Sequence, residues 1–493
     1  MAYTFGDGFD LYVATADAVA GYWDSGTTTN STIVAGRFAG GQAWSTGSNN
    51  SIIALTKSSG ANDAVHHFVL AFRQSAALTG TSLGCNLQLL DGTTAQCSIV
   101  FRSDGAVLLT SGTPAGAVLA TYTGAVSAQN TWFAFEFEVI ISPTAGRFRA
   151  RKNGNASDDF DSGATLNTRP GANTYANKLQ FSSGPTQLSI GANQQVIDDL
   201  LWRSDAASVP WVGDIRCYTR MPASDVSAQF ARVPSPAGVS QTTAQTTTTS
   251  KVANAGMMSA FVATFSGTIA AGQVSLLTGG TGNMKAAIYD ATRTTVLATS
   301  NAVVNPVNGS NAITFGTLLT VTKGVTYHLA VDQDTTLVYN VTGANQFTFT
   351  TTYASFPAAS PSTSVGAGPV FTLNITPTVS AEYVNETLQD AATTYVYDSV
   401  VGHSDLYTIA ALAATPASVV AVTTRGYVQK SDAGTRNGAV QLKSGATTVQ
   451  STSTALSTSW QWLWRTDATD PATGAAWTPT AVNNVTVGPV VTA

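Results

Sequence analysis

Apolar and polar residues alternate one by one over most of the chain. The runs FVLAFRQS (68–75) and TWFAFEFEVIIS (131–142) place large apolar residues at every second position. Successive side chains of a strand point to opposite faces, so this period predicts strands that are buried on one face. Turn-forming sequences such as SDG and KNG separate the runs, as in hairpins. Because strands follow closely on one another without an amphipathic helix, we predict an all-β protein of two-sheet sandwiches.

The strand pattern recurs in three blocks, which we predict to be three domains. The chain has 493 residues, and a single domain usually spans about 100–200. The run VPSPAGVSQTTAQTTTTSK lacks an apolar period and is typical of a linker. The predicted parts are a first β-sandwich over 1–215, a linker over 216–250, a second β-sandwich over 251–378 and a β-rich C-terminal domain over 379–493. One short helix is expected near Thr478, because Pro479 suits a first helical position.

Charge is scarce and evenly spread. Only 10% of the residues are charged, and the net charge is −5. No Lys/Arg cluster could follow a phosphate backbone, so we expect no nucleic-acid partner. No apolar run reaches about 18 residues, so we expect no membrane insertion. The N-terminal sequence lacks the pattern of a secretory signal, which predicts assembly in a cytoplasm, and the three cysteines are expected to be buried free thiols.

Glu136 and Glu138 in FEFEVII are the most enzyme-like feature. They lie two residues apart on one predicted strand and therefore on one face. Retaining glycosidases use two nearby carboxyl groups, one as acid and one as nucleophile. A third alternating acid is absent, because Ala134 and Ile140 occupy the neighbouring positions of that face. We favour two glutamates on the solvent face of a strand and keep a glycan-cleaving enzyme as an alternative.

Asp198 and Asp199 in VIDDLLW are candidate ligands for calcium, which prefers several oxygen ligands. Neighbouring strand residues point to opposite faces, so both could reach one ion only at a β-bulge. His66 and His67 diverge for the same reason, and no Gly-rich phosphate loop follows a strand. We therefore predict no metal ion, no cofactor and no catalytic residue.

Aromatic residues on the rims of a sandwich are the usual platforms for sugar rings, since they offer an apolar face beside polar groups. Most large aromatic side chains of a sandwich nevertheless belong to its core. The alternating tryptophans of SWQWLWRTD (459–467) share one face, which favours core or a subunit interface over a ligand site. The candidate glycan-binding residues are Trp23, Trp44, Tyr175 and Trp211.

Several segments together resemble one family. FGDGFDLY, GRFAGG, WFAFEFEVII, GRFRARKNG and VIDDLLW followed by GDIRCYTRMPASD resemble the laminin-G-like, concanavalin-fold domain of bacteriophage virion proteins. EYVNETLQDAATTYVYDSVVGHSDLYTIAAL, QKSDAGTRNGAVQLKSG and TDPATGAAWTPTAVNNVTVG look like the companion domain in those proteins. The two blocks cover roughly two thirds of the chain. Between them, NMKAAIYDATRTTVLATS and VTKGVTYHLAVDQ resemble carbohydrate-binding sandwich modules.

The resemblance implies a structural component of a phage particle, made in the host cytoplasm and assembled with other virion proteins. It implies a tail- or head-associated protein and no cofactor. Of the two positions we favour the tail or its fibres, with lectin-like contact to host-surface glycan, and we predict no enzymatic activity. Capsid decoration is the first alternative, and a bacterial surface adhesin is a further one. Repeated copies on a symmetric particle predict a homo-oligomer, with a trimer favoured.

Overall fold

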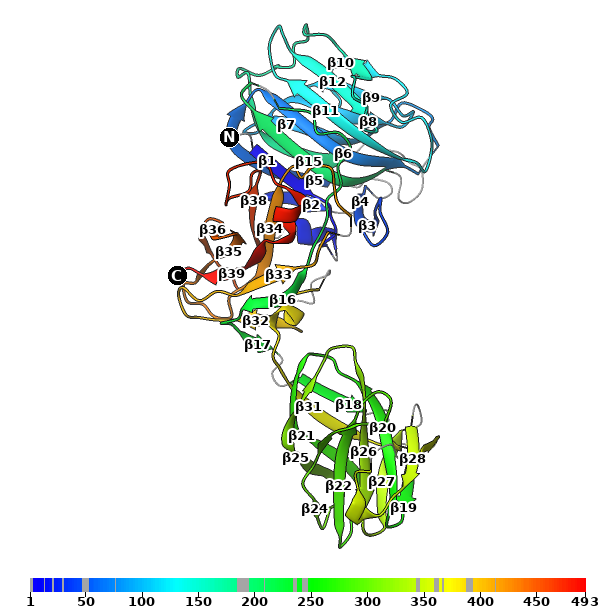
Figure 1. Ribbon diagram of the computed structural model, residues 1–493. Helices are drawn as coiled ribbons and strands as arrows, with labels where there is room; N and C mark the ends of the chain where they lie inside the picture. Colours follow the sequence, from blue (N-terminus) through cyan, green and yellow to red (C-terminus); the bar gives the residue numbers. More distant parts are fainter. Residues whose placement is uncertain are drawn as a thin grey trace. The chain divides into compact units, whose positions relative to one another are not determined.

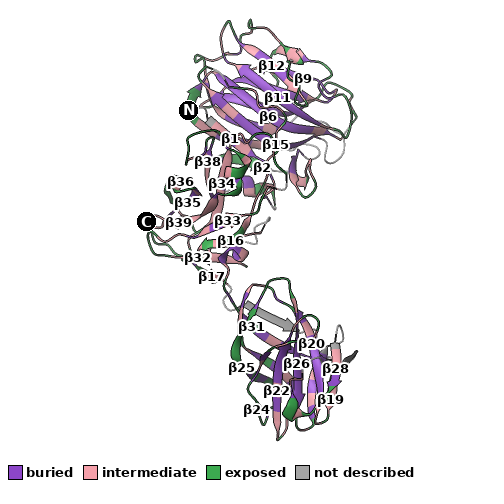
Figure 2. Cartoon of the chain, in the orientation of Figure 1, coloured by how far each residue is buried: buried purple, intermediate pink, exposed green. Residues whose placement is uncertain are grey.

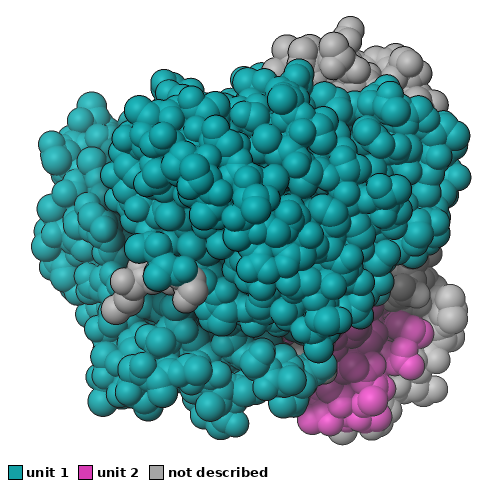
Figure 3. Space-filling model, turned by 90° about the horizontal axis from the view of Figure 1, so that it is seen from above, with its two compact units in different colours: residues 1–229, 386–391, 399–493 teal, residues 230–385, 392–398 magenta. Residues whose placement is uncertain are grey.

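A computed structural model describes residues 3–12, 14–19, 22–28, 31–46, 53–75, 77–183, 195–207, 209–233, 237–241, 247–342, 346–358, 363–365, 368–386, 393–412 and 414–493. The chain forms two compact units, which Figure 3 shows in separate colours. Unit 1 comprises Met1–Gln229, Glu386–Ala391 and Ser399–Ala493, and unit 2 comprises Phe230–Asn385 and Ala392–Asp398. The block predicted as a separate C-terminal domain therefore lies largely in the same compact unit as the first sandwich.

The first sandwich of unit 1 consists of two antiparallel sheets (Figure 1). Sheet A has the order β13 (Phe160–Asp161), β12 (Arg147–Lys152), β11 (Trp132–Ile140), β6 (Val65–Gln74), β15 (Gln195–Asp205), β4 (Gln42–Ser45) and β3 (Thr32–Ala35), with β1 (Tyr3–Asp7) paired to β15. Sheet B has the order β10 (Val118–Tyr122), β9 (Val107–Ser111), β8 (Thr94–Arg102), β7 (Leu83–Asp91), β14 (Ala176–Ser183), β5 (Ile53–Asp63) and β2 (Ser25–Thr28). A 3-10 helix, η1 (Thr15–Val19), precedes β2.

The alternation predicted from the sequence places the core between these sheets. On β11, Phe135 and Phe137 point inward and are fully buried among residues of both sheets. Phe101 of sheet B packs against both rings. Figure 2 shows the buried strands of this sandwich in purple. Because side chains alternate, Glu136 and Glu138 of β11 point to the outer face of sheet A.

The C-terminal part of unit 1 forms two further sheets. One has the order β16 (Pro222–Ser227), β33 (Leu406–Ile409), β39 (Thr486–Val491), β35 (Asn437–Ser444) and β36 (Thr447–Gln450), with β37 (Thr454–Ala455) paired to β35. The other pairs β34 (Val422–Val428) with β38 (Gln461–Asp467). The predicted helix is confirmed as α1 (Pro479–Asn483), and the Thr478 side chain caps it by accepting the Ala481 N–H at 3.1 Å.

Arg425 of β34 joins the C-terminal part to the first sandwich. Its guanidinium lies 3.4 Å from the ring centroid of Tyr22 and donates to Oδ1 of the fully buried Asp7 at 3.3 Å. Trp464 packs edge-on against Phe5 and Tyr22. The alternating tryptophan stripe thus includes a contact within the chain, and the Arg425–Asp7 pair links the two parts of unit 1.

The segment 216–250, predicted as a linker, contains strands. β16 pairs with β33 in unit 1, and β17 (Ala231–Val233) pairs with β32 (Tyr395–Tyr397) in unit 2. β18 (Ala237–Gln241) and β19 (Thr247–Lys251) join a sheet of unit 2. Thr and Ser have no apolar period in this run, but β-branched Thr fits a strand whose backbone is paired. These strands therefore cannot be predicted from the composition of the segment, because they depend on pairing with distant strands.

Unit 2 is a second two-sheet sandwich. Sheet E has the order β18, β31 (Phe371–Pro377), β21 (Gly267–Thr278), β27 (Leu337–Thr342) and β19, with β25 (Gly309–Val321) paired to β21 and β30 (Gly368–Pro369) to β27. Sheet F has the order β23 (Val296–Thr299), β22 (Asn283–Tyr289), β26 (Thr326–Gln333), β20 (Ala255–Val262), β28 (Gln346–Thr350) and β29 (Thr363–Val365), with β24 (Val303–Val304) paired to β22. The short helices are η2 (Tyr353–Ser355) and η3 (Ser380–Tyr383).

The all-β sandwich prediction is confirmed for both units. Each core lies between two antiparallel sheets and is lined by residues that alternate along the strands. Within the part of the chain that the structure describes, no helix has the length and apolar character needed to cross a membrane.

Candidate functional site

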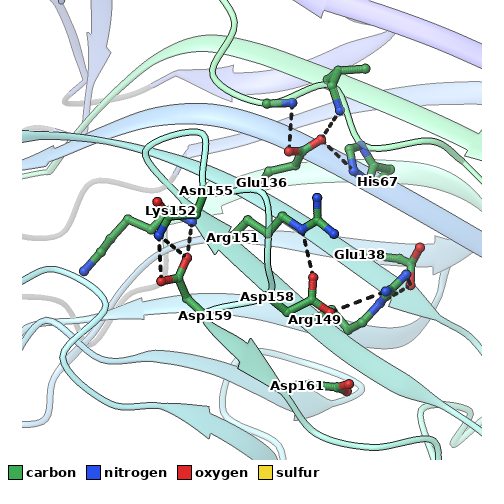
Figure 4. Close-up of polar contacts among 12 residues, drawn as sticks. His67, Glu136, Glu138, Arg149, Arg151, Lys152, Asn155, Asp158, Asp159 and Asp161 are labelled. Carbon is green, nitrogen blue, oxygen red and sulfur yellow. Dashed lines mark hydrogen bonds and ion pairs between the residues drawn. The ribbon is translucent and has the colours of Figure 1, made fainter.

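Residues 209–219, which we call the strap, cross the outer face of sheet A. Glu136 of β11 holds the strap, because its Oε1 accepts the N–H of Val212 and its Oε2 accepts the N–H of Gly213 at 2.9 Å (Figure 4). Gly213 has φ +78°, a conformation that glycine adopts without strain. Charge-assisted hydrogen bonds of this kind are stronger than neutral ones. Glu136 is therefore an anchor for the strap.

Further side chains hold the rest of the strap down. The contacts are an ion pair of Arg37 with Asp214, a hydrogen bond from the Cys217 N–H to Asp199 Oδ1 at 2.7 Å and one from the Thr219 hydroxyl to Asp10 Oδ2 at 2.9 Å. The strap is thus fixed at several points along its length, and its backbone hydrogen bonds go largely to carboxylates of the sandwich.

The prediction that Glu136 and Glu138 lie on a solvent face is wrong. Their exposed fractions are only 3% and 5%. The strap covers Glu136, and Arg149 of β12 covers Glu138, donating to its Oε1 from Nε at 2.8 Å and from Nη2 at 2.6 Å. Glu138 and Arg149 are directly opposite in the β11–β12 register. Cross-strand charge pairing therefore buries Glu138, and the sequence pattern of one strand does not reveal such a pairing.

His67 of β6 lies under the strap and has no exposed surface. Its Nε2 is 3.0 Å from Glu136 Oε1, but neither ring nitrogen has a partner in hydrogen-bond geometry among the described residues. The imidazole meets the Trp211 ring edge-on, with 5.0 Å between centroids. An imidazole beside a carboxylate can serve in proton transfer. For this pair to do so, the strap would have to move, since it occupies both Glu136 oxygens.

Trp211 lies on top of a network of planar charged groups. The guanidinium carbons of Arg151 and Arg149 are 4.1 and 5.1 Å from its ring centroid. Asp158 links the two arginines, accepting from Arg151 Nε at 2.8 Å and from Arg149 Nη1 at 3.4 Å (Figure 4). The side chains of Arg149, Arg151 and Asp158 keep 21%, 19% and 20% of their surface exposed. We call these four residues the Trp211 platform; a half-buried ring beside oriented polar groups suits recognition of a sugar.

Asp198 and Asp199 lie at a β-bulge. The sequence predicts that both side chains could reach one ion only at such a bulge. The β15–β6 register shifts after Asp198, and Asp199 has φ +52°. Burial raises the pKa of Asp198 to about 6, and burial together with the Asp198 carboxylate raises the pKa of Asp199 further. Among the described residues, no three His, Cys, Asp or Glu side chains are grouped so as to hold a metal ion.

The four candidate glycan-binding residues are not brought together. Trp23 and Trp44 are fully buried, so they are core residues and present no ring face to a ligand. The indole of Trp23 donates to Asp7 at 2.9 Å, and Trp44 packs against Phe9. Tyr175 is half-buried just before β14 of sheet B, whereas Trp211 is half-buried over sheet A. Sequence reasoning cannot separate buried from rim tryptophans, because both occur among apolar neighbours.

Sequence reasoning also missed the platform arginines and His67. Arg149 and Arg151 alternate in GRFRARKNG, and this alternation places both on the face of sheet A that carries Glu136 and Glu138. The sequence signal for these residues is a pair of alternating runs, FEFE and RFRAR, which place acidic and basic side chains on the same face of two consecutive strands.

No family model matches the chain, and no curated protein matches it. Among solved structures, the chain is similar to alginate lyase vAL-1 from Chlorella virus, with a TM-score of 0.28 and 10% identity over 39% of this chain and 96% of that one. It is similar to the carbohydrate esterase vb_24B_21 from Shiga toxin-encoding bacteriophage phi24B, with a TM-score of 0.29 and 15% identity over 42% of this chain and 98% of that one. A third is the CBM22-1-CBM22-2 tandem domain of Paenibacillus barcinonensis Xyn10C, with a TM-score of 0.20 and 8% identity over 68% and 97% of the two chains.

The prediction that the chain is not an enzyme is corrected by these matches. They include a lyase and an esterase that act on carbohydrate. A sandwich of this kind can carry catalytic or non-catalytic sites, so the fold does not exclude catalysis.

Proposed function

We propose that this chain is a structural component of a bacteriophage particle, tail- or fibre-associated, that contacts host-surface glycan through the outer face of sheet A. The proposal includes assembly with other virion proteins and a homo-oligomer, with a trimer favoured. Capsid decoration is the alternative position on the particle, and the same glycan contact would serve there.

The Trp211 platform is the observation that carries the glycan contact. Its ring is held by two guanidinium groups that are themselves oriented by Asp158 and Glu138. Such pre-ordering lowers the entropy lost on binding, because the side chains are already in place. Sugar hydroxyls need both donors and acceptors, and the arginine and aspartate groups supply both.

Glu136 and Glu138 are a poor acid–nucleophile pair in this arrangement. Glu136 accepts two backbone N–H groups, and Glu138 accepts two guanidinium N–H groups of Arg149. A nucleophile or general acid must reach the glycosidic bond directly. Glycan cleavage by this pair would require the strap and Arg149 to withdraw together. If a Glu136→Gln variant lost the release of products from host polysaccharide, cleavage would become the favoured function.

The test is binding of the full chain to purified host-surface polysaccharide, with Trp211→Ala compared to Trp460→Ala. Trp460 is a matched control, because it is also half-buried, stacks with Tyr427 at 5.2 Å between ring centroids, and lies outside sheet A. We expect Trp211→Ala to lose about 2 kcal/mol, roughly 30-fold in affinity, as for other aromatic anchors. Equal affinity of the two variants, or no binding by the wild type, would contradict the proposed contact.

A further inference from the structure

Three polar side chains of unit 2 meet on the outer face of sheet F. Lys285 of β22 and Asp332 of β26 are directly opposite in the strand register. Tyr353 of η2 lies over them, with its ring centroid 4.7 Å from the Lys285 ammonium nitrogen. The Tyr353 N–H is held by Asn254 Oδ1 at 2.7 Å. These contacts bring an acid, a base and a phenol together from three elements.

Two atoms of this cluster are buried without a partner. Asp332 has no exposed surface; its Oδ1 accepts the Gln333 N–H at 2.9 Å, whereas its Oδ2 has no hydrogen-bond partner among the described residues. The Tyr353 hydroxyl oxygen is likewise buried and unpartnered within that set. Burial and the Asp334 and Asp332 carboxylates raise the pKa of Tyr353 to about 12. Buried polar atoms are nearly always hydrogen-bonded, so we expect a bound molecule to form hydrogen bonds with these two atoms.

The chemistry of the cluster selects that occupant. Asp332 Oδ2 is an acceptor, the Lys285 ammonium is a donor, and the Tyr353 hydroxyl is both. The positive charge of Lys285 opposes a metal cation, and the negative charge of Asp332 opposes an anion. A hydroxyl pair can donate to the carboxylate and accept from the ammonium and the phenol. Asp334 does not compete for it, because Asn283 donates to both of its oxygens.

We propose that Lys285, Asp332 and Tyr353 bind the vicinal diol of a neutral sugar. This site belongs wholly to unit 2 and is independent of the Trp211 platform. Tyr353 is half-buried on its short 3-10 turn, and the proposal requires its ring to move so that a sugar can reach Asp332.

The experiment uses the full chain and saturation-transfer NMR with the methyl glycosides of glucose, galactose and mannose. Asp332→Asn keeps the side-chain shape and replaces one acceptor by a donor, and Tyr353→Phe removes only the hydroxyl. We expect each variant to lose at least about tenfold in affinity for the glycoside that binds. Asp334→Asn is the matched control and is expected to bind within twofold of the wild type. Thermal unfolding of each variant confirms that unit 2 is folded.

Three outcomes would overturn the site. They are no binding of any of these glycosides by the wild type, equal binding by folded Asp332→Asn, and a crystal structure grown with the sugar in which a water, and no sugar, lies between Asp332 and Tyr353. Trp211→Ala is measured in parallel and is expected to keep this binding. This measurement therefore distinguishes failure of the unit 2 site from failure of the sheet A contact.

Discussion

Replacing Asp199 by Asn removes one charge from the buried Asp198–Asp199 pair, and we expect the protein to become more stable in alkaline buffer. An unfolded aspartate has a pKa of about 3.9. In the folded protein the pKa of both carboxyl groups is raised, chiefly by burial. Between these values the folded state binds more protons than the unfolded state, so the free energy of unfolding falls as the pH rises.

The upper limit of the effect follows from the Asp199 shift. A change of pKa from 3.8 to about 8 is worth at most about 6 kcal/mol, at about 1.4 kcal/mol per unit, and Asn recovers only part of this because its amide is buried in the same place. Asn keeps an oxygen for the Cys217 N–H, and its amide can donate to Asp198. We therefore expect Asp199→Asn to raise the free energy of unfolding by about 1–3 kcal/mol at pH 8.5, and by little at pH 4, where the pair is largely protonated.

Urea unfolding at pH 4 and pH 8.5, followed by the fluorescence of the buried tryptophans, measures this difference. Asp161→Asn is the control: hydrogen bonding to Arg147 lowers the pKa of Asp161 to about 2, so it stays ionised at both pH values. The reasoning is refuted if Asp199→Asn is no more stabilising at pH 8.5 than at pH 4, or if the control shows the same pH dependence.

Two further substitutions test the contacts of unit 1. Arg425→Met leaves the Asp7 charge buried and unpaired and should lower the free energy of unfolding by about 3–5 kcal/mol, whereas Arg436→Met breaks an exposed pair and should cost under about 1 kcal/mol in the same urea titration. Glu136→Ala removes the acceptor for two strap amides, so their hydrogen exchange, followed by mass spectrometry, should quicken at least tenfold while exchange in unit 2 stays unchanged; unchanged exchange in the strap would show that Glu136 does not hold it.

The sandwich architecture could be predicted because its cause is local. Alternating apolar residues, as in the Phe135–Phe137 strand, specify both the strand and its buried face. The short helix at Pro479 was predictable from its capping residues alone. The strands at 237–241 and 247–251 were not, because a Pro/Ser/Thr-rich run is held in a sheet only by the distant strands it pairs with.

The candidate site depends on register and on long-range contacts, which a single sequence does not display. Glu138 is buried because Arg149 lies opposite it on the next strand. Glu136 is buried because the strap, some 75 residues later, folds back over it. Trp23 and Trp211 look alike in sequence. Trp23 is nevertheless a core residue whose indole donates to Asp7, whereas Trp211 is half-buried and stacks with arginine side chains.

Electron cryo-microscopy of purified particles of the encoding phage tests the central claim most directly. The account predicts density for both units at the tail or its fibres, with the Trp211 platform facing outward. Density over the capsid would move the proposed position but keep the glycan contact. Absence of the chain from the particles would contradict the virion role.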